Sequence, residues 1–328
     1  MTSCWNLVLL LALLGSCTPT ASLTHFRGAA MGTSYSIKVV LPQGVAREQA
    51  KARIDETLRE FDLLFSTYNK DSEISRFNAH RGDRPFVASE PFAGLILRSL
   101  KLAKRTLGAF DPTVGPLSRL YGFGPDGEPV DAPPSDATIA AVRKTIGWQR
   151  LQAAGLQISK NPASVELDLN AIAKGAGVDA VARSLDGLGS GSYMVEIGGE
   201  VRCRGTKPDG ALWRLGISLP DKSGFADKVD LLDVAMATSG SYLQFKHLGS
   251  TRVHHILDPR TGRNADSRIV SVTVIAPSCE LADGLATALM VLGPEAGDEV
   301  LSVPDLASVK VMYLLAGDSG IELRYVRW

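Results

Sequence analysis

One strand-to-helix segment, residues 269–293, constrains the fold of this chain more than any other stretch. Three valines alternate there with Ser271 and Thr273, which is the two-residue period of a strand whose sides face different surroundings. Ser278 is a good N-cap for the helix that follows, and Gly293-Pro294 is predicted to end it. The apolar stripe of this helix recurs at three- and four-residue spacing and consists of Leu281, Leu285, Ala288 and Leu292.

Two polar side chains stand outside that stripe. Asp283 and Thr287 lie four residues apart, so a carboxylate and a hydroxyl sit one above the other on a single helix face. Such hard oxygen ligands suit Mg²⁺ or Ca²⁺ rather than zinc. A structural interpretation competes, because the helix dipole alone favours an Asp in the first turn, and a helical Thr often bonds back to its own backbone. The rest of the chain favours the metal site.

Length and charge exclude several classes of protein. With 328 residues the chain can form one large domain or two closely packed ones. Its 35 basic residues balance its 35 acidic residues, which argues against a nucleic-acid-binding surface. We find no internal repeat, so an ordinary globular body is expected.

The N-terminus is expected to be an export signal. Leu7–Leu14 is an almost purely apolar run, too short to span a bilayer and of the length of a signal-peptide core. It ends in Leu14-Gly15-Ser16-Cys17, which resembles a bacterial lipobox, although residues 1–6 contain no Lys or Arg. We expect removal of residues 1–16, a lipid on Cys17, a tether over 17–24 and a body over 25–328. The protein would then be anchored at the periplasmic face of a membrane, with secretion without an anchor as the alternative.

Two cysteines, Cys203 and Cys279, remain after that processing. An exported protein could pair them, but the sequence cannot place them within disulfide range. Two unpaired core residues are therefore expected.

Apolar periodicity predicts the scaffold of the body. A helix beginning near Ala46 carries a buried stripe made of Ala50, Ile54, Leu58, Phe61 and Phe65. Further helices are predicted over 91–106 and 136–146. Strands are predicted over 35–41, 151–159, 165–169, 193–197, 201–205, 213–218, 229–235, 309–315 and 321–326. Ala237–Gly240 is expected to be a small-residue turn.

Irregular loops are predicted to present groups to a ligand. The polar stretches 66–69 and 72–78 carry Tyr68 and Phe77, whose rings could stack on a ligand ring or simply pin the loop. Two prolines and a glycine make residues 109–117 a rigid, irregular loop of the kind that binds ligands.

A candidate phosphate site lies within residues 165–179. A predicted strand leads there into a helix whose first turns are built from small residues and contain Lys174. Free N–H groups at a helix N-terminus bind anions, and a nearby lysine adds a full charge. The spacing of a P-loop is absent, and a tight helix-packing face is the structural alternative.

Adjacent histidines, His254 and His255, are expected on a strand. Successive strand side chains point to opposite faces, so the two cannot easily bind one metal ion. One buried and one exposed histidine are predicted. Asp258–Gly262 follows as a turn by its composition.

Taken in order, these motifs resemble the ApbE family of FAD:protein FMN transferases, also called flavin-trafficking lipoproteins. The resemblance covers nearly the whole mature chain and is carried by residues 31–33, 72–78, 110–117, 167–179, 198–200, 239–240, 255–262 and 282–289. It implies a mixed α/β (α+β) fold with antiparallel-rich sheets, packed helices and a core related to the T-fold. Departures are small: Tyr121 stands where the family often has Trp, and Ser241 where an acid is common.

The resemblance implies Mg²⁺-dependent transfer of the FMN half of FAD to a threonine hydroxyl of a partner protein, with release of AMP. Expected acceptors are subunits of membrane flavin-carrying electron-transport complexes. The implied catalytic residues are Lys174, His255 and Asp283. The implied metal ligands are Ala171, Asp283, Ala286 and Thr287. The implied FAD-site residues are Met31, Tyr68, Ala109, Phe110, Asp111, Asp168, Lys174, Gly198, Gly199, Glu200, Ser239 and Leu257.

Two rival functions remain at this point. One is a periplasmic FAD-binding lipoprotein that hydrolyses FAD to FMN and AMP without an acceptor protein. The other is a non-enzymatic solute-binding lipoprotein, against which stands the carboxylate–hydroxyl pair beside a phosphate site.

Overall fold

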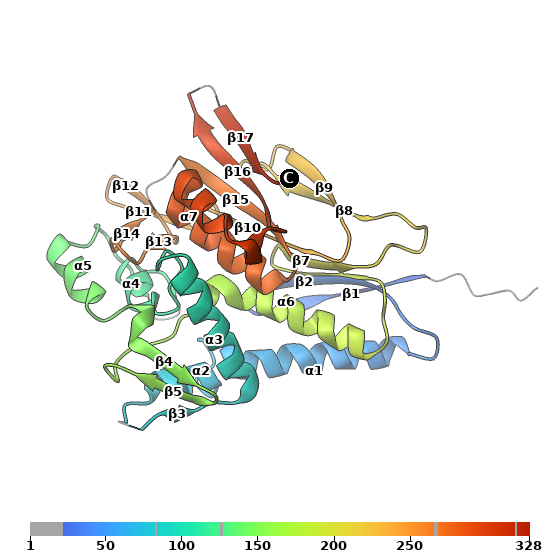
Figure 1. Cartoon of the computed structure of the whole chain (residues 1–328), viewed down its shortest axis with the longest axis horizontal. Helices are drawn as coiled ribbons and strands as arrows, with labels where there is room; N and C mark the ends of the chain where they lie inside the picture. Colours follow the sequence, from blue (N-terminus) through green and yellow to red (C-terminus); the bar gives the residue numbers. More distant parts are fainter. Residues whose placement is uncertain (1–21, 83, 125–126, 266–267, 319) are drawn as a thin grey trace, which may run out of the picture.

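The computed structural model describes residues 22–328 except 83, 125–126, 266–267 and 319 (Figure 1). Cys17 and the predicted signal peptide therefore lie outside the described residues. The first strand, β1 (Leu23–Ala30), already includes the last two residues of the predicted tether. Within the described part of the chain, no helix is both long and apolar enough to cross a membrane.

An eight-stranded sheet, antiparallel throughout, forms the centre of the molecule. Its order is β1-β2-β6-β7-β10-β15-β16-β17. After β1, the strands are β2 (Thr33–Val40), β6 (Tyr193–Ile197), β7 (Glu200–Arg204), β10 (Ala235–Gly240), β15 (Ile269–Ala276), β16 (Lys310–Gly317) and β17 (Gly320–Val326). The strands follow one another across the sheet in chain order, and both halves of the chain contribute side chains to one core beneath it.

The two faces of the sheet are covered differently. Helices α6 (Asn170–Gly187) and α7 (Cys279–Leu301) pack against one face, with α1 (Arg47–Phe65) beyond α6 (Figure 1). The hairpin β8 (Trp213–Ser218)–β9 (Phe225–Leu231) packs on the opposite face through a separate apolar cluster. The helix side holds the candidate site.

Smaller elements surround the helix layer. One group comprises α2 (Glu73–Ala79), α3 (Glu90–Arg105) and the three-stranded sheet of β3 (Phe86–Val87), β5 (Gln157–Lys160) and β4 (Leu151–Ala154). A second group comprises α4 (Gly115–Leu120), α5 (Asp136–Arg143), β11 (Phe245–Leu248), β12 (Thr251–His254), β13 (Leu257–Asp258) and β14 (Arg263–Asn264). Short 3₁₀ helices lie at Trp148–Arg150 and Pro304–Leu306.

Most of the predicted scaffold is confirmed. All five stripe residues of α1 are buried, and α3 matches the helix predicted over 91–106. The Ser278 hydroxyl accepts a hydrogen bond from Leu281 N–H at 3.3 Å, which is the predicted N-cap of α7. Cys203 and Cys279 are buried and unpaired, as expected.

Two predicted loops were wrong. Residues 73–79 form helix α2, which Ser72 caps by accepting from Ser75 N–H at 3.1 Å, and Phe77 is fully buried in the core rather than free to stack on a ligand. Gly115 begins α4, so only the first part of the 109–117 loop is irregular.

Several predicted strands also differ. Residues 165–169 belong to no strand; the Asn78 side chain instead bonds to the Leu167 N–H at 2.7 Å and to the Leu167 carbonyl at 2.9 Å. The predicted turn at 237–240 is instead part of central strand β10, which is lined by small residues where α7 packs against it. Residues 151–159 form a hairpin, and the strand over 229–235 is divided between β9 and β10. The predicted helix end at Gly293-Pro294 is confirmed as a kink within α7: Gly293 is non-helical, with φ of 81° and ψ of 169°, and a second helical segment follows it.

Candidate active site

The crossing of α6 and α7 is built on glycine. A Cβ at Gly175 would lie 2.3 Å from the Cys279 carbonyl oxygen, and the Gly175 N–H donates to Asp283 Oδ2 at 2.9 Å. A Cβ at Gly284 would lie 2.4 Å from Leu102 of α3. The small residues of 165–179 therefore form a tight packing face, which was the structural alternative, and that face brings α6 within reach of Asp283.

Three charged side chains meet at this crossing. Lys174 of α6 is hydrogen-bonded and ion-paired to Glu200 Oε1 of β7, while Asp283 comes from α7. Glu200 and Asp283 are 2% and 4% exposed, so both carboxylates are almost completely removed from water. Burial opposes the charge on Lys174, but the negative charges of Asp283 and Glu200 outweigh that effect and raise its pKa. Lys174 therefore stays protonated.

Burial disfavours the charged forms of both carboxylates and so raises their pKa values. Burial raises the pKa of Asp283 to about 7, with a further increase from the charge of Glu200, although Lys174 and the Gly175 N–H act against it. Burial likewise raises the pKa of Glu200, against the lowering effect of Lys174. Glu200 Oε2 is buried and has no hydrogen-bond partner among the described residues. A group with unsatisfied oxygen atoms of this kind is suited to a further cation or donor.

The oxygen atoms at the crossing fit Mg²⁺. Asp283 and Thr287 lie one turn apart on α7, and the Thr287 hydroxyl lies 3.2 Å from the hydroxyl of Ser239 on β10. Ala171 stands in the first turn of α6, and Ala286 precedes Thr287. The described residues contain no group of three or more His, Cys, Asp or Glu arranged to hold a metal. Mg²⁺ does not need one, since it commonly binds one or two carboxylates together with substrate phosphates.

His255 is electrostatically coupled to this crossing. Burial lowers its pKa, its hydrogen bond to Gln244 opposes this effect, and the charge of Lys174 lowers the pKa further. Its Nδ1 lies 3.1 Å from the Gln244 carbonyl oxygen. Because a carbonyl only accepts, Nδ1 carries the proton and Nε2 is free to accept one. His254 and His255 are both half-buried, so the predicted split into one buried and one exposed histidine was wrong.

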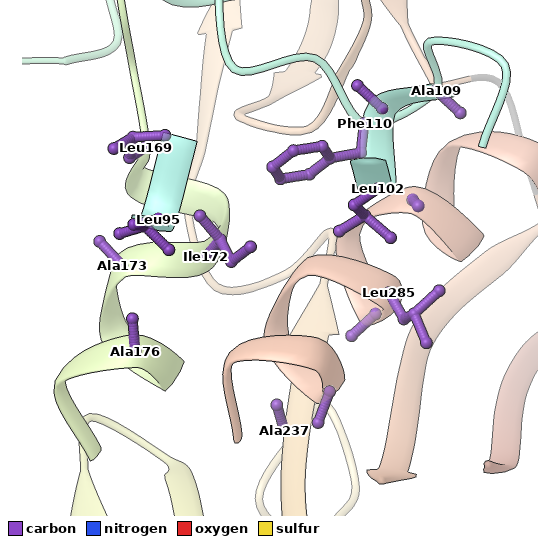
Figure 2. Close-up of a cluster of buried hydrophobic side chains, with 14 of the residues drawn as sticks. Leu95, Leu102, Ala109, Phe110, Leu169, Ile172, Ala173, Ala176, Ala237 and Leu285 are labelled. Atoms are coloured by element: carbon purple, nitrogen blue, oxygen red, sulfur yellow. The ribbon is translucent and has the colours of Figure 1, made fainter. Parts of the chain in front are cut away.

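The loop after α3 is fixed by its own side chains. Figure 2 shows Phe110 among buried residues of α3, α6 and α7. The Ala109 and Phe110 N–H groups both donate to Thr106, and no described residue donates a hydrogen bond to either carbonyl. Asp111 accepts from Thr113 N–H at 2.8 Å and from Trp148 N–H at 2.9 Å. Burial raises the pKa of Asp111 although these bonds favour its charged form. The carboxylate of Asp111 thus shapes the loop.

Other predicted FAD-site residues frame the N-terminal end of α6. Met31 adopts a left-handed backbone with φ of 53°, and a Cβ on Gly177 would lie 2.6 Å from its sulfur. The backbone N–H of Asp168 donates to the Pro112 carbonyl at 2.7 Å, which ties the α3–α4 loop to the start of α6. Burial raises the pKa of the half-buried Asp168 carboxyl.

The remaining predicted residues lie at different depths. Gly198 and Gly199 form the β6–β7 turn with φ of 61° and 102°, conformations that favour glycine. Leu257 is buried in β13. Tyr68 is 74% exposed in the turn after α1, and no hydrogen bond between described residues connects its side chain to the crossing.

The sequence profile described as "ApbE family" matches residues 31–311. The chain belongs to the ApbE family. A Vibrio cholerae relative named FAD:protein FMN transferase is 41% identical over 315 residues, covering 95% of this chain and 93% of the relative. An Escherichia coli K12 relative of the same name is 36% identical over 296 residues, covering 88% and 84%.

Solved ApbE structures share the fold. The flavin transferase ApbE from Vibrio cholerae superposes with a TM-score of 0.86 at 40% identity and covers 94% of this chain and 98% of that one. The ApbE protein from Thermotoga maritima gives 0.82 at 29% identity, with coverage of 93% and 97%. The predicted family and the mixed α/β fold with antiparallel-rich sheets are thereby confirmed.

Sequence reasoning missed one residue that organises this ApbE site. Asp179 of α6 accepts from Cys279 N–H at 3.1 Å and from Glu280 N–H at 3.0 Å, at the start of α7. It also pairs with Arg202 of β7 at 2.6 Å. Asp179 thus connects the three elements that carry Lys174, Glu200 and Asp283. The signal in the sequence was an acidic residue on an otherwise apolar helix face, where a buried charge requires partners.

Proposed function

We propose that this chain transfers the FMN half of FAD to a hydroxyl group of an acceptor protein and releases AMP. The observation that carries the proposal is the buried set Lys174, Glu200 and Asp283 at the α6–α7 crossing of an ApbE fold. In the reaction the acceptor oxygen forms a bond to the FMN phosphorus while the phosphoanhydride P–O bond breaks. AMP leaves with the bonding electrons, and the hydroxyl proton passes to a base. Relatives that bear the name FAD:protein FMN transferase support this assignment.

The chain's own residues would act mainly by positioning and charge. Asp283 and Thr287, with the carbonyls of Ala171 and Ala286, would hold Mg²⁺. When bound, Mg²⁺ neutralises phosphate charge and orients the pyrophosphate. Lys174 remains charged between two carboxylates, so its ammonium group can stabilise the negative charge that grows on the departing AMP phosphate.

His255 is the base that the geometry favours. Its lowered pKa keeps the ring neutral near pH 7, and the Nδ1 contact with the Gln244 carbonyl leaves Nε2 to take the acceptor proton. The backbone around Asp168 and the Phe110 carbonyl would line the FAD where the α3–α4 loop is tied to α6.

The proposal includes the acceptor residue and the location of the enzyme. We propose that the acceptor residue is a threonine of a membrane flavin-carrying electron-transport complex. A lipid on Cys17 would then hold the enzyme at the periplasmic face, beside such a complex. Loss of membrane association in Cys17→Ser, with activity retained, supports the anchor; equal membrane binding of that variant contradicts it.

Incubation with FAD, Mg²⁺ and a purified acceptor subunit tests the transfer. Mass spectrometry should show the acceptor heavier by one FMN moiety on a threonine, with one AMP released per modification. Release of AMP and free FMN without modification of any acceptor would instead identify a hydrolase.

A further inference from the structure

The hairpin β11–β12 carries an open strand edge beside His255. The His255 N–H donates to the Gln244 carbonyl at 3.1 Å, so Gln244 and His255 face each other in a hydrogen-bonded position directly beyond the last ladder pair. Bonded and non-bonded pairs alternate in antiparallel strands. The next pair, Phe245 with His254, is therefore non-bonded, as is His247 with Arg252. The backbone N–H and C=O groups of these residues point away from the partner strand.

The two outer edges of this hairpin are treated differently. On β12, Asn264 covers the outward groups of His254: its Nδ2 donates to the His254 carbonyl at 2.6 Å, and its Oδ1 accepts from the His254 N–H at 3.3 Å. On β11, no described residue bonds to the outward backbone groups of Phe245 or His247. An unprotected edge of this kind is a template for pairing with another chain.

The side chains around that edge suit a macromolecular partner. Leu243 and Phe245 are 55% and 45% exposed, although they stand within two residues of Gln244, which contacts His255. Lys246 and Arg252 supply positive charge within residues 241–257, which contain no Asp or Glu, and the Arg252 guanidinium lies 4.3 Å from the centre of the Phe245 ring. His254 and His255 add no charge near pH 7, because burial lowers the pKa of both. The edge is therefore apolar, basic and free of carboxylates.

We propose that the acceptor protein docks here by strand addition. An extended acceptor segment with acidic side chains flanking its hydroxyl residue pairs with the outward backbone groups of Phe245 and His247. Backbone pairing gives affinity, contacts with Leu243 and Phe245 select apolar side chains, and the basic residues select acidic ones. The segment then lies beside Gln244, which places its hydroxyl at His255. This inference rests on the proposed function and names the surface that recognises its protein substrate.

Variants of the edge test this docking with separate readouts. His247→Pro removes an outward N–H while leaving the bonded pairs of the ladder intact. Leu243→Ser with Phe245→Ser removes the apolar contacts. The matched control is Leu323→Ser with Tyr325→Ser on edge strand β17, where the two side chains are 40% and 44% exposed. Each protein is assayed for FAD affinity, for AMP release without acceptor, and for FMN transfer to the acceptor subunit that the wild type modifies.

We expect both edge variants to raise KM for the acceptor by about ten-fold, the size of a moderate interface contact, with FAD affinity and acceptor-free AMP release unchanged. The β17 control should match the wild type. Replacing the acidic residues of the acceptor's flavin-carrying segment by Asn and Gln should raise KM in the wild type as well. An unchanged KM in the edge variants, or a parallel loss of acceptor-free AMP release, would overturn the docking site.

Hydrogen exchange separates failure of docking from failure of the proposed function. Added acceptor should slow exchange of the Phe245 and His247 amides, and the acidic-to-amide acceptor should slow it less. Protection at these amides without any FMN transfer would sink the transferase assignment and leave the docking site standing. FMN transfer without protection of these amides would contradict the docking site and support the transferase assignment.

Discussion

The α6–α7 crossing and the β11–β12 hairpin both bear on His255, yet they are built in opposite ways. In the crossing, the carboxylates of Glu200 and Asp283 are buried, and Gly175 has no room for a Cβ. At the hairpin, apolar side chains are exposed, and the outward backbone groups of Phe245 and His247 have no partner among the described residues. Charge stabilisation is strongest where water is excluded and groups are fixed in advance, whereas recognition of a protein requires accessible groups. The comparison predicts that mutations in the two regions fail in different ways.

The largest effect should come from Asp283→Asn. The amide keeps an acceptor for the Gly175 N–H but loses the charge that would hold Mg²⁺, so we expect turnover to fall on the order of a thousand-fold, as for loss of a principal electrostatic group. Asp283→Ala is the poorer test, because it leaves that buried N–H without its acceptor. Asp230→Asn, on an exposed pair with Arg214, is the control and should retain full turnover.

Lys174→Met should lower turnover by roughly ten- to a thousand-fold, the range typical of losing one electrostatic donor. FAD binding should weaken less, because the two ring systems of FAD make separate contacts. The structure adds a complication, since the variant leaves buried Glu200 without its cation. The double variant with Glu200→Gln removes that effect. Steady-state kinetics together with an FAD titration separates an effect on turnover from an effect on FAD binding. An unchanged turnover number in the double variant would show that Lys174 takes no part in the chemistry.

Glycine substitutions in α6 should separate packing from chemistry. Gly175→Ala forces a methyl group against the Cys279 carbonyl, where a Cβ would lie 2.3 Å away, and should lower the free energy of unfolding by about 1–3 kcal/mol. Gly187→Ala, at the end of the same helix, meets nothing within 4 Å and should be neutral or slightly stabilising. Chemical denaturation measures both. Equal stability of the two variants would contradict the tight crossing.

The sequence predicted the crossing better than it predicted its surroundings. The spacing of Asp283 and Thr287 and the small residues near Lys174 are local patterns, and the structure places them on two helices in contact. Asp179 was missed because its partners, the α7 N-terminus and Arg202, are distant in sequence. The segment that forms strand β10 was predicted to be a turn because small residues are common in turns and also fit a strand against a packed helix. Its pairing with β7 and β15, which are distant in sequence, makes it a strand.

The smallest expected effect concerns pH and the hairpin. Burial, together with the charge of His255, lowers the pKa of His254 to about 4 from an ordinary 6.5. Between these values the unfolded chain takes up the proton more readily, so this residue's contribution to stability is lost as the pH falls from 6.5 towards 4. In His254→Gln the free energy of unfolding should fall less steeply over that window. Identical slopes for variant and wild type would show that His254 is not held neutral.

The most direct test of the account is the position of a divalent ion at the crossing. Mn²⁺ can replace Mg²⁺ at oxygen ligands, and its anomalous scattering locates it in crystals grown with FAD. We predict a peak in contact with Asp283 and Thr287, beside the FAD pyrophosphate and within reach of Lys174, and no such peak in Asp283→Asn. A pyrophosphate bound elsewhere, or a Mn²⁺ peak that persists in Asp283→Asn, would contradict the assignment of the α6–α7 crossing as the catalytic centre.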